Sequence, residues 1–440
     1  MGKSYRVKCT HLDENGRGVV KFNGSEFSVA GVLPGEKVFI ELVYTKGGTF
    51  AKLVKIDEPS PLRIEPVCAN AGKCGGCQLM HLPYEKQLAF KQDMVEGLFK
   101  EIKADDIIGM EEPYHYRNKI HTTFSFARGG KILSGIYEEN THRLIPVADC
   151  FIQDKCSVKI TETIKKLMKK YKLTPYNEDN GHGNIRHVMF RKGAFSGELM
   201  VVIVSGNKIF PNKAAFCEDL VKAHKEITTV ILNYNTAKTS MVLGNEQTVL
   251  YGSGTITDTM CGVKFKISPR SFYQVNPYQT KKLYEKAIEL AGIKPSETVL
   301  DAYCGIGTIS LIASKAAKKV TGVELNEVAV KDAKFNAKNN NITNAEFICA
   351  DAGEYMAKNE KKFDIVILDP PRSGSDRKFL DSLIKCAPSR IVYISCNPVT
   401  QKRDVEYLEK DYKVERVVPV DLFPQTYHVE SVVLMSRKDN

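Results

Sequence analysis

The sequence predicts an α/β protein whose carboxyl-terminal part holds a parallel sheet with helices on both faces. Three observations support this fold class. The first 57 residues contain several short strand patterns in close succession. In the middle of the chain, strand and helix patterns mix without a repeat. From about residue 263 onward, strand patterns and helix patterns alternate regularly. We therefore expect three domains: an OB-like β-barrel at 1–57, a mixed α/β central domain at 58–262 and an alternating α/β domain at 263–440.

The amino-terminal segment alternates apolar and polar residues in the manner of half-buried strands. The Asn-Gly pairs at 15–16 and 23–24 favour tight turns between neighbouring strands. Five strands in so short a segment suit a small Greek-key barrel. The expected strands are Tyr5–Thr10, Gly18–Phe22, Glu26–Val29, Lys37–Thr45 and Thr49–Ile56.

The composition is ordinary for a globular protein, and the net charge points to a polyanionic partner. Formal net charge is +11, and such an excess favours binding to phosphates because it releases condensed counterions. Solubility alone is the alternative explanation. No apolar run reaches the roughly 20 residues that span a bilayer, and the first residues lack the apolar core of a secretory signal. We therefore expect a cytoplasmic protein without membrane contact.

A glycine-rich turn follows the buried strand that ends at Ala302. The run Gly305-Ile306-Gly307-Thr308 lets a ligand approach the backbone closely, and Glu324 ends the next strand, where a carboxylate can bind ribose hydroxyls. The third glycine of the dinucleotide fingerprint is absent, which speaks against NAD, but one glycine pair is weak evidence by itself, so NAD stays a rival ligand. The spacing of Asp301, the glycine pair, Glu324 and Asp351 resembles that of class I S-adenosylmethionine-dependent methyltransferases, which have a Rossmann-like fold.

Two further strands end at the same edge of the predicted sheet. Asp369 follows the strand Ile365–Leu368, and Cys396 follows the strand Ile391–Ser395. Ligands of open α/β sheets bind at the carboxyl ends of parallel strands, so both side chains should face the glycine-rich turn. Glu430 precedes the final apolar strand. Taken alone, Cys396 is more often an inert buried thiol than a reactive one.

Several strings of residues in the carboxyl-terminal half, in this order, resemble the RNA uracil-C5 methyltransferase family. The strings are Ser271–Asn276, Asp301–Thr308, Asp369–Arg372, Ser395–Pro398 and His428–Glu430. The resemblance implies that Cys396 is the nucleophile and Glu430 the proton acceptor. It further implies a pocket for S-adenosylmethionine and uracil that is lined by Gln274, Tyr303, Glu324 and Asp369, with Phe272 packing against the base.

The implied chemistry explains why a cysteine and a carboxylate occur together. Carbon 5 of uracil is too weak a nucleophile to attack a sulfonium methyl group, whereas a thiolate that adds to carbon 6 converts the ring into an enolate. A base must then remove the proton from carbon 5 so that the thiolate can leave. Either the pocket lowers the pKa of the cysteine or a neighbouring base takes its proton. The target uridine must leave its stack, which is easiest in an unpaired loop.

Three cysteines, Cys68, Cys74 and Cys77, lie close together in a glycine-rich segment. Thiols so near one another along the chain can ligate one metal centre, and disulfides are rare in the cytosol. By resemblance to the members of the family with this spacing, Cys150 would be the fourth ligand and the centre a [4Fe–4S] cluster with a structural or RNA-positioning role. Zinc held by the same four thiolates is the alternative.

The amino-terminal barrel resembles a TRAM domain, a small RNA-binding barrel. This barrel, the cysteine-rich middle and the methyltransferase domain together resemble enzymes that act on 23S ribosomal RNA, so we expect a monomeric enzyme that forms 5-methyluridine there. Transfer RNA is the alternative substrate, because some cluster-bearing relatives modify it. DNA cytosine-C5 methylation fits poorly, since its nucleophile normally stands between Pro and Gln rather than between Ser395 and Asn397. A non-catalytic ribosome-assembly protein is disfavoured, because it would need neither Cys396 nor Glu430.

Overall fold

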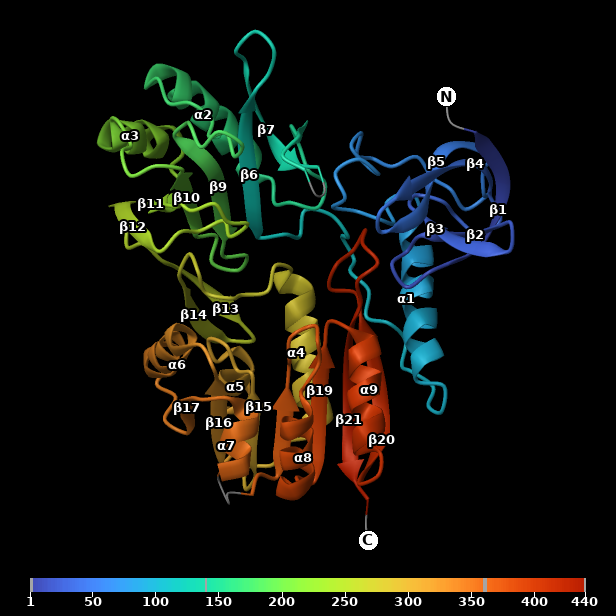
Figure 1. Ribbon diagram of the computed structural model, residues 1–440. Helices are drawn as coiled ribbons and strands as arrows, with labels where there is room; N and C mark the ends of the chain where they lie inside the picture. Colours follow the sequence, from blue (N-terminus) through green and yellow to red (C-terminus); the bar gives the residue numbers. More distant parts are fainter. Residues whose placement is uncertain (1–2, 139–140, 359–361, 439–440) are drawn as a thin grey trace.

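The computed structural model describes residues 3–138, 141–358 and 362–438. The chain forms three parts: a small amino-terminal barrel, a middle sheet with two helices, and a carboxyl-terminal sheet between helices. In Figure 1 the barrel and the middle sheet lie in the upper half and the carboxyl-terminal sheet lies below them. Among these residues, no helix is long and apolar enough to cross a membrane.

The amino-terminal part is an antiparallel sheet with the strand order β3-β2-β1-β4-β5. Because β3 also packs against β5, the sheet curls toward a barrel. Its interior is filled by small apolar side chains that include Val7, Val20, Val38 and Ile40. The five strands predicted from the sequence are confirmed within two residues at each end: β1 Ser4–Leu12, β2 Gly18–Phe22, β3 Ser25–Val29, β4 Lys37–Thr45 and β5 Gly48–Glu58.

The middle part is a mixed sheet with the strand order β12-β11-β10-β9-β6-β7-β8. One face is covered by two helices, α2 (Cys156–Lys170) and α3 (Lys213–Ala223). Side chains of the opposite face, such as Met200 and Val202, share a core with the carboxyl-terminal part. The strands are β6 Lys119–Phe126, β7 Ile132–Tyr137, β8 Leu144–Pro146, β9 Ile185–Lys192, β10 Leu199–Ser205, β11 Ile227–Tyr234 and β12 Glu246–Tyr251.

A hairpin joins the middle part to the carboxyl-terminal part. Its strands are β13 (Ile256–Met260) and β14 (Val263–Ile267), so it straddles the domain boundary expected near residue 262. Its apolar residues belong to the same core as the carboxyl-terminal sheet.

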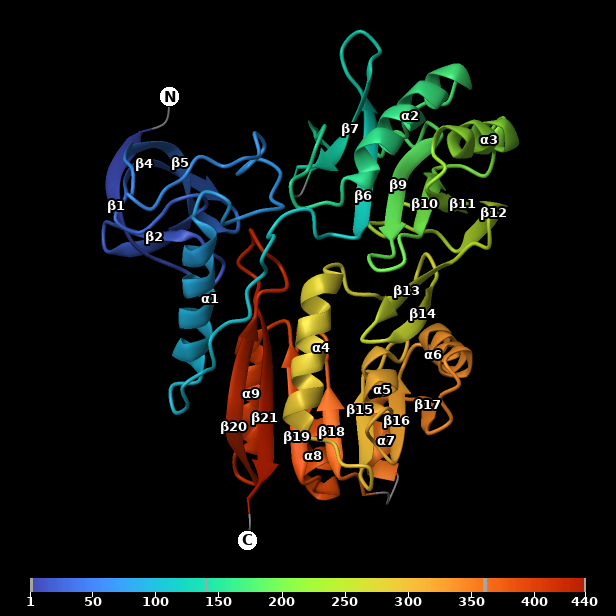
Figure 2. The same cartoon turned by 180° about the vertical axis from the view of Figure 1, so that it is seen from behind.

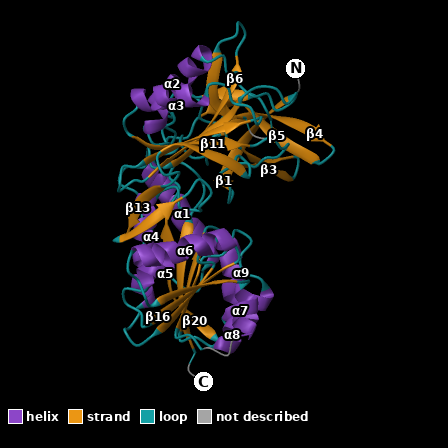
Figure 3. Cartoon of the chain, turned by 90° about the vertical axis from the view of Figure 1, so that its left-hand side faces the viewer, coloured by secondary structure: helices purple, strands orange, loops and turns teal. Residues whose placement is uncertain are grey.

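The carboxyl-terminal part has the strand order β17-β16-β15-β18-β19-β21-β20, which is a Rossmann-like methyltransferase fold. Helices lie on both faces of this sheet (Figure 3). The strands are β15 Thr298–Ala302, β16 Lys319–Glu324, β17 Ala345–Cys349, β18 Ile365–Leu368, β19 Arg390–Ser395, β20 Tyr412–Val420 and β21 Glu430–Arg437. The helices are α4 Pro277–Ala291, α5 Thr308–Ala313, α6 Glu327–Asn339, α7 Ala352–Lys358, α8 Arg377–Cys386 and α9 Pro398–Leu408.

The expectation of a wholly parallel sheet is wrong at one edge. Strands β15 to β19 are parallel, but β21 runs antiparallel to both β19 and β20. The chain returns from β20 to β21 through residues 421–429 without a crossover helix, and such a short return forces the antiparallel direction. This reversal places the first residue of β21, Glu430, at the edge where the parallel strands end.

Helix α1 (Tyr84–Leu98) packs on the carboxyl-terminal sheet although it lies within the range 58–262 that we predict for the central domain. Its residue Val95 shares a core with Val405 of α9 and Val417 of β20. The reverse view shows α1 beside these two elements (Figure 2). The segment between the barrel and the middle sheet therefore contributes to the part of the molecule that holds Cys396 and Glu430.

Candidate active site

Three parallel strands bring the predicted site residues to one edge of the carboxyl-terminal sheet. Ala302 of β15 pairs with Leu368 of β18, and Leu368 pairs with Tyr393 of β19, so these strands end side by side. The residues just beyond them include Tyr303, Asp369 and Cys396. Ser395 pairs with Ser431, which places Glu430 beside Cys396.

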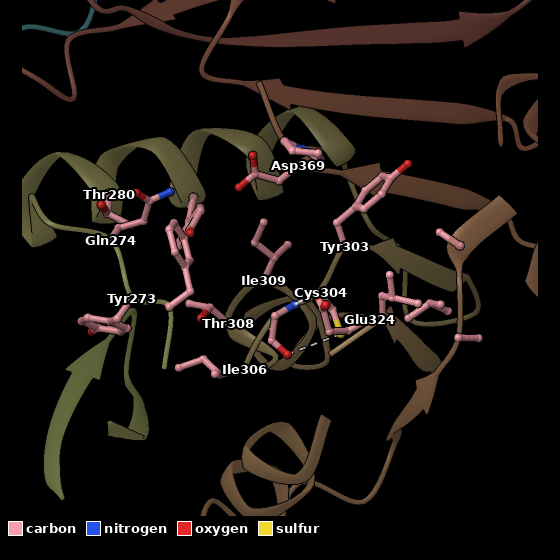
Figure 4. A pocket seen from close by; sticks show the side chains of 18 of the residues that line it. Tyr273, Gln274, Thr280, Tyr303, Cys304, Ile306, Thr308, Ile309, Glu324 and Asp369 are labelled. Carbon is pink, nitrogen blue, oxygen red and sulfur yellow. Dashed lines mark hydrogen bonds between the residues drawn. The ribbon is translucent and has the colours of Figure 1, made fainter. Parts of the chain in front are cut away.

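A cavity of about 400 Å³ lies at this edge, within the usual size of small-ligand pockets. It brings together every residue that the sequence analysis assigned to the cofactor: Gln274, Tyr303, Gly305, Thr308, Glu324, Asp351 and Asp369. In Figure 4, Gln274 and Asp369 lie on the side of the cavity near a helix, and Glu324 lies on the opposite side. Phe272 also lines the cavity and is 70% exposed, which leaves its ring free to stack on a base.

The two glycines of the turn are required for different reasons. A side chain on Gly305 would meet no atom within 4 Å, so the backbone there is open to the cavity. A side chain on Gly307 would lie 2.8 Å from the ring of Phe347, so this glycine allows the turn to pack against the sheet. Both have positive φ, as does Tyr303 at +68°. Strain of this kind in a non-glycine residue is characteristic of ligand sites.

Carboxylates mark the far end of the cavity. Glu324 accepts hydrogen bonds from the backbone N–H of Gly305 at 3.1 Å and from that of Asn326 at 2.8 Å. Asp351 accepts one from the N–H of Glu354 at 2.9 Å. These bonds fix both carboxylates while leaving oxygen lone pairs for ribose or amine donors of a ligand. The cavity therefore fits S-adenosylmethionine: an open backbone, fixed carboxylates and the apolar side chains of Ile306 and Leu325.

Replacing Glu324 by alanine should weaken binding of S-adenosylmethionine by about 10–100-fold, because one or two hydrogen bonds to a charged group are lost. Isothermal titration calorimetry with the purified protein measures this change. Glu327→Ala is the matched control: its carboxylate lies three residues further on, is exposed and pairs with Lys331. Equal affinity of the Glu324 variant and the control would contradict the assignment.

Cys396 lines a second, smaller cavity of about 250 Å³. Arg372 and His428 line it as well, whereas Asp369 and Pro371 line the cofactor cavity. The loop 369–372 therefore forms a wall of both cavities and separates the Cys396 thiol from the cofactor cavity.

The pocket does not lower the pKa of the Cys396 thiol. Burial, together with the neighbouring carboxylates of Glu430 and Asp369, raises this pKa to about 11. The guanidinium of Arg372 acts in the opposite direction and lowers it. Of the two routes to a thiolate, the structure thus favours transfer of the proton to a neighbouring base over a thiol that ionises by itself.

Glu430 and Asp369 are carboxyl groups with raised pKa values. Burial raises the pKa of Glu430 to about 8, with a further contribution from the charge of Asp369. Burial also raises the pKa of Asp369 to about 7. Glu430 lines neither cavity, but its charge acts on both Cys396 and Asp369, so it lies close to both. A carboxyl group that titrates near neutral pH is suited to general-base catalysis.

Side chains of helix α1 hold the loop that leads to Glu430. Lys91, which is fully buried, donates to Asp421 at 2.6 Å and to the carbonyl of Phe423 at 3.2 Å. Gln87 and Gln425 exchange hydrogen bonds, one between their side chains at 3.0 Å and one from the Gln425 backbone N–H at 3.0 Å. Such a satisfied buried network fixes the position of the loop and hence of Glu430.

Sequence reasoning gave no role to Arg372, Tyr284 or Lys91. Arg372 belongs to the string Asp369–Arg372, of which only Asp369 is predicted to line the pocket. Tyr284 lies on α4 and lines the cofactor cavity, where burial raises the pKa of its hydroxyl well above the usual range. It therefore stays a neutral donor near Asp369. No sequence signal marks Lys91, because a lysine on a helix usually faces water.

The four predicted metal ligands, Cys68, Cys74, Cys77 and Cys150, have free thiols. Three of them, Cys68, Cys77 and Cys150, pack against the small apolar cluster of Met80, Met110, Tyr116 and Ile152. Burial, together with the charges of the other three thiols, raises the pKa of Cys77 to about 12. The four thiols therefore lie near enough to one another for their charges to interact. No group of three or more His, Cys, Asp or Glu side chains in the described part of the chain is arranged to hold a metal ion.

The fold and the cavity define a class of protein. The Rossmann-like sheet, its glycine-rich turn and the cavity with fixed carboxylates fit the class of S-adenosylmethionine-dependent methyltransferases. Residues 83–438 match the model of the tRNA (Uracil-5-)-methyltransferase family. The chain belongs to this family of RNA uracil-C5 methyltransferases, and it is an enzyme that methylates carbon 5 of uracil in RNA.

Known proteins resemble the chain over its whole length. It is 40% identical to an uncharacterized RNA methyltransferase of Clostridium tetani, covering 98% of this chain and 96% of that protein. It is 42% identical to one of Bacillus cereus, with 97% and 95% covered. Among solved structures, the Pyrococcus abyssi tRNA (uracil-54, C5)-methyltransferase in complex with S-adenosyl-L-homocysteine is similar with a TM-score of 0.81 and 28% identity, covering 98% of this chain and all of that one.

Proposed function

We propose that the enzyme methylates uracil through a covalent bond between Cys396 and carbon 6 of the base. The observation that carries this proposal is the placement of the Cys396 thiol and the Glu430 carboxyl side by side, next to the loop that separates the thiol from the cofactor cavity. S-Adenosylmethionine supplies the methyl group as a sulfonium.

The proposed reaction has two stages. The Cys396 thiol gives its proton to the neighbouring carboxylate of Asp369, which leaves Glu430 free for the second stage. The sulfur bonds to carbon 6, and the electron pair of the 5,6 double bond forms the bond from carbon 5 to the methyl group. The bond between this methyl group and the sulfonium sulfur breaks, and its electron pair stays on that sulfur, so S-adenosylhomocysteine is the leaving group. Glu430 then takes the proton from carbon 5. The electrons of that C–H bond re-form the double bond, and the sulfur leaves carbon 6 as thiolate. The raised pKa of Glu430 suits this second stage, because the group can both hold and release a proton near neutral pH.

We infer that the substrate is 23S ribosomal RNA. The net charge of +11 and the barrel with its resemblance to TRAM domains support a large RNA partner. Transfer RNA is a second candidate, and a specific observation favours it: the Pyrococcus abyssi enzyme that resembles this chain over its whole length acts on uracil 54 of tRNA. The presence of the barrel and the middle part therefore does not distinguish the two substrates.

Mapping 5-methyluridine in ribosomal and transfer RNA tests the choice of substrate. A strain that lacks the gene should lose 5-methyluridine from 23S RNA and regain it when the wild-type gene is restored. Restoration with Cys396→Ala serves as the control for loss of chemistry alone. A loss confined to transfer RNA would make tRNA the substrate.

We propose that Cys68, Cys74, Cys77 and Cys150 hold a [4Fe–4S] cluster. The observation that supports this proposal is that the four thiols lie near enough to one another for their charges to interact. Zinc held by the same four thiolates is the alternative. The chemistry of the cluster would be structural: it would tie Cys150 to the segment that precedes α1.

Protein purified without oxygen should be brown and contain about four irons, as expected for one four-iron cluster. Cys77→Ser should lower the iron content and the thermal stability, because a ligand is lost. Cys217→Ser, which changes a buried thiol of α3, should leave the iron content unchanged. Metal analysis and the visible absorption spectrum measure both effects. A colourless preparation that contains one zinc would contradict the cluster.

A further inference from the structure

Two residues of the amino-terminal barrel line the Cys396 cavity. Glu14 and Asn15 belong to the turn between β1 and β2, and they face the same cavity as Arg372, Cys396 and His428. Figures 1 and 2 both show the barrel beside the loop that joins β20 to β21. The barrel therefore reaches the pocket of the proposed nucleophile and does more than extend the surface of the molecule.

The turn has a fixed conformation. The side chain of Asp13 accepts hydrogen bonds from the backbone N–H groups of Asn15 and Arg17, both at 2.9 Å. Backbone bonds between Asp13 and Arg17 at 2.8 Å, and from Gly16 to Asp13 at 3.0 Å, close the turn. A turn with these bonds presents the Asn15 side chain in a defined direction.

The turn is also seated against the wall of the cavity. A side chain on Gly16 would lie 2.9 Å from Leu79 Cδ2 and 3.3 Å from Tyr427 Cβ, so the backbone packs directly on these two residues. The φ angle of Gly16 is +69°, which a residue with a side chain rarely adopts. Tyr427 lies in the loop that leads to Glu430 and lines the same cavity. The contact thus holds the turn at the pocket.

Asn15 has the chemistry of a residue that reads a nucleotide. Its side-chain amide offers both a donor and an acceptor, as do the edges of nucleobases. It is half-buried at the cavity, and its side chain makes no hydrogen bond within the described residues. The neighbouring Glu14 is exposed and negatively charged, so it is a poor contact for phosphate. The turn therefore suits a contact with a base better than one with the RNA backbone.

We propose that the β1–β2 turn is part of the substrate pocket and that Asn15 is a specificity-determining residue, which hydrogen-bonds to the base in the Cys396 cavity or to the one next to it. This inference rests on the proposed covalent function of Cys396. It assigns to the barrel a selective contact at the site of reaction, in addition to any general attraction of RNA by its lysines and arginines.

The test compares Asn15→Ala with Asn23→Ala. Asn23 occupies the corresponding Asn-Gly turn between β2 and β3 of the same barrel and does not line the cavity. On a synthetic RNA stem-loop that the wild-type enzyme methylates, Asn15→Ala should lower kcat/KM by about 3–10-fold, the effect of one lost hydrogen bond. The Kd of S-adenosylmethionine and the salt dependence of RNA binding should not change. Asn23→Ala should behave as wild type.

A second variant tests the seating of the turn. Gly16→Ala should reduce kcat/KM more strongly than Asn15→Ala, because the new methyl group moves the turn away from Tyr427. A circular dichroism spectrum and a melting curve show whether the barrel remains folded. Equal kcat/KM for Asn15→Ala, Asn23→Ala and wild type would overturn the inference. So would a uniform loss of affinity for all RNAs with a changed salt dependence, which would make Asn15 a general backbone contact.

Failure of the proposed function gives a different result. If Cys396→Ala still forms 5-methyluridine, the covalent mechanism fails, and Asn15 is then tested by binding alone. The ratio of affinities for the stem-loop with uridine and the same stem-loop with cytidine should fall in Asn15→Ala but not in Asn23→Ala. An unchanged ratio would overturn the inference without reference to catalysis.

Discussion

Cys396→Ala should abolish methyl transfer, with a fall in kcat of at least about 10⁴-fold, as expected when a covalent nucleophile is removed. Without the bond from sulfur to carbon 6, the uracil ring stays conjugated. Its carbon 5 is then too weak a nucleophile to attack the methyl group. Transfer of a tritiated methyl group from S-adenosylmethionine to RNA measures the loss.

Binding of the cofactor separates a chemical defect from a folding defect. Cys396 does not line the cofactor cavity, so Cys396→Ala should bind S-adenosylmethionine with the affinity of wild type. Cys217→Ala is the matched control, since this thiol is buried on α3 and touches neither cavity. A Cys396→Ala enzyme that still forms 5-methyluridine would refute the covalent mechanism.

Glu430→Gln should slow turnover by about 10²–10⁴-fold and leave the protein bonded to RNA. The amide cannot take the proton from carbon 5, so the methylated base stays attached to Cys396. Denaturing gels of a reaction with labelled RNA should show a slow-migrating band that disappears in the double variant Cys396→Ala, Glu430→Gln. Glu415→Gln is the control, because this carboxylate lies on β20 and pairs with Ser436 and Lys413.

The pH dependence gives a second measure of the same group. Glu430 must be ionised to accept a proton, so kcat/KM of wild type should rise with pH through about 8, the raised pKa of this carboxyl. Glu430→Gln should lose this limb of the profile. A variant with normal turnover, no trapped band and an unchanged pH profile would remove Glu430 from the reaction.

Stability should vary with pH in the opposite direction. In the unfolded chain Glu430 releases its proton near pH 4.5, whereas in the folded protein it keeps the proton up to about pH 8. The folded state therefore binds more protons between these values, and the free energy of unfolding falls as pH rises through this window. Glu430→Gln removes this contribution, so urea unfolding of the variant should depend less on pH than that of wild type.

Local patterns in the sequence predicted much of the fold and of the cofactor site. The alternation of apolar and polar residues predicts each barrel strand, and the Asn-Gly pairs predict the turns between strands. Both signals are local, because they depend only on residues next to one another in the sequence. The glycine-rich turn and the carboxylates at strand ends predicted the cofactor cavity. Parallel strands bring their carboxyl ends to one edge, so Tyr303, Glu324 and Asp369 meet without further information.

Contacts between distant segments were not predictable in this way. The antiparallel return of β21 depends on the short loop after β20, and it decides that Glu430 lies beside Cys396. The pKa values of Cys396 and Glu430 follow from burial and from charges more than 20 residues away along the chain, which no local pattern records. The same holds for Lys91, whose buried charge is paired only because the folded chain brings Asp421 beside it.

The sequence by itself thus predicted the family, the order of the three parts of the chain and the residues that line the cofactor cavity, because these are set by local periodicity and by short strings of residues. Only the tertiary structure decided that burial and neighbouring carboxylates raise the pKa of the Cys396 thiol, that helix α1 holds the loop before Glu430, and that the barrel reaches the cavity of Cys396. These features depend on burial and on close approach between segments far apart in the chain, and both arise only when the chain has folded.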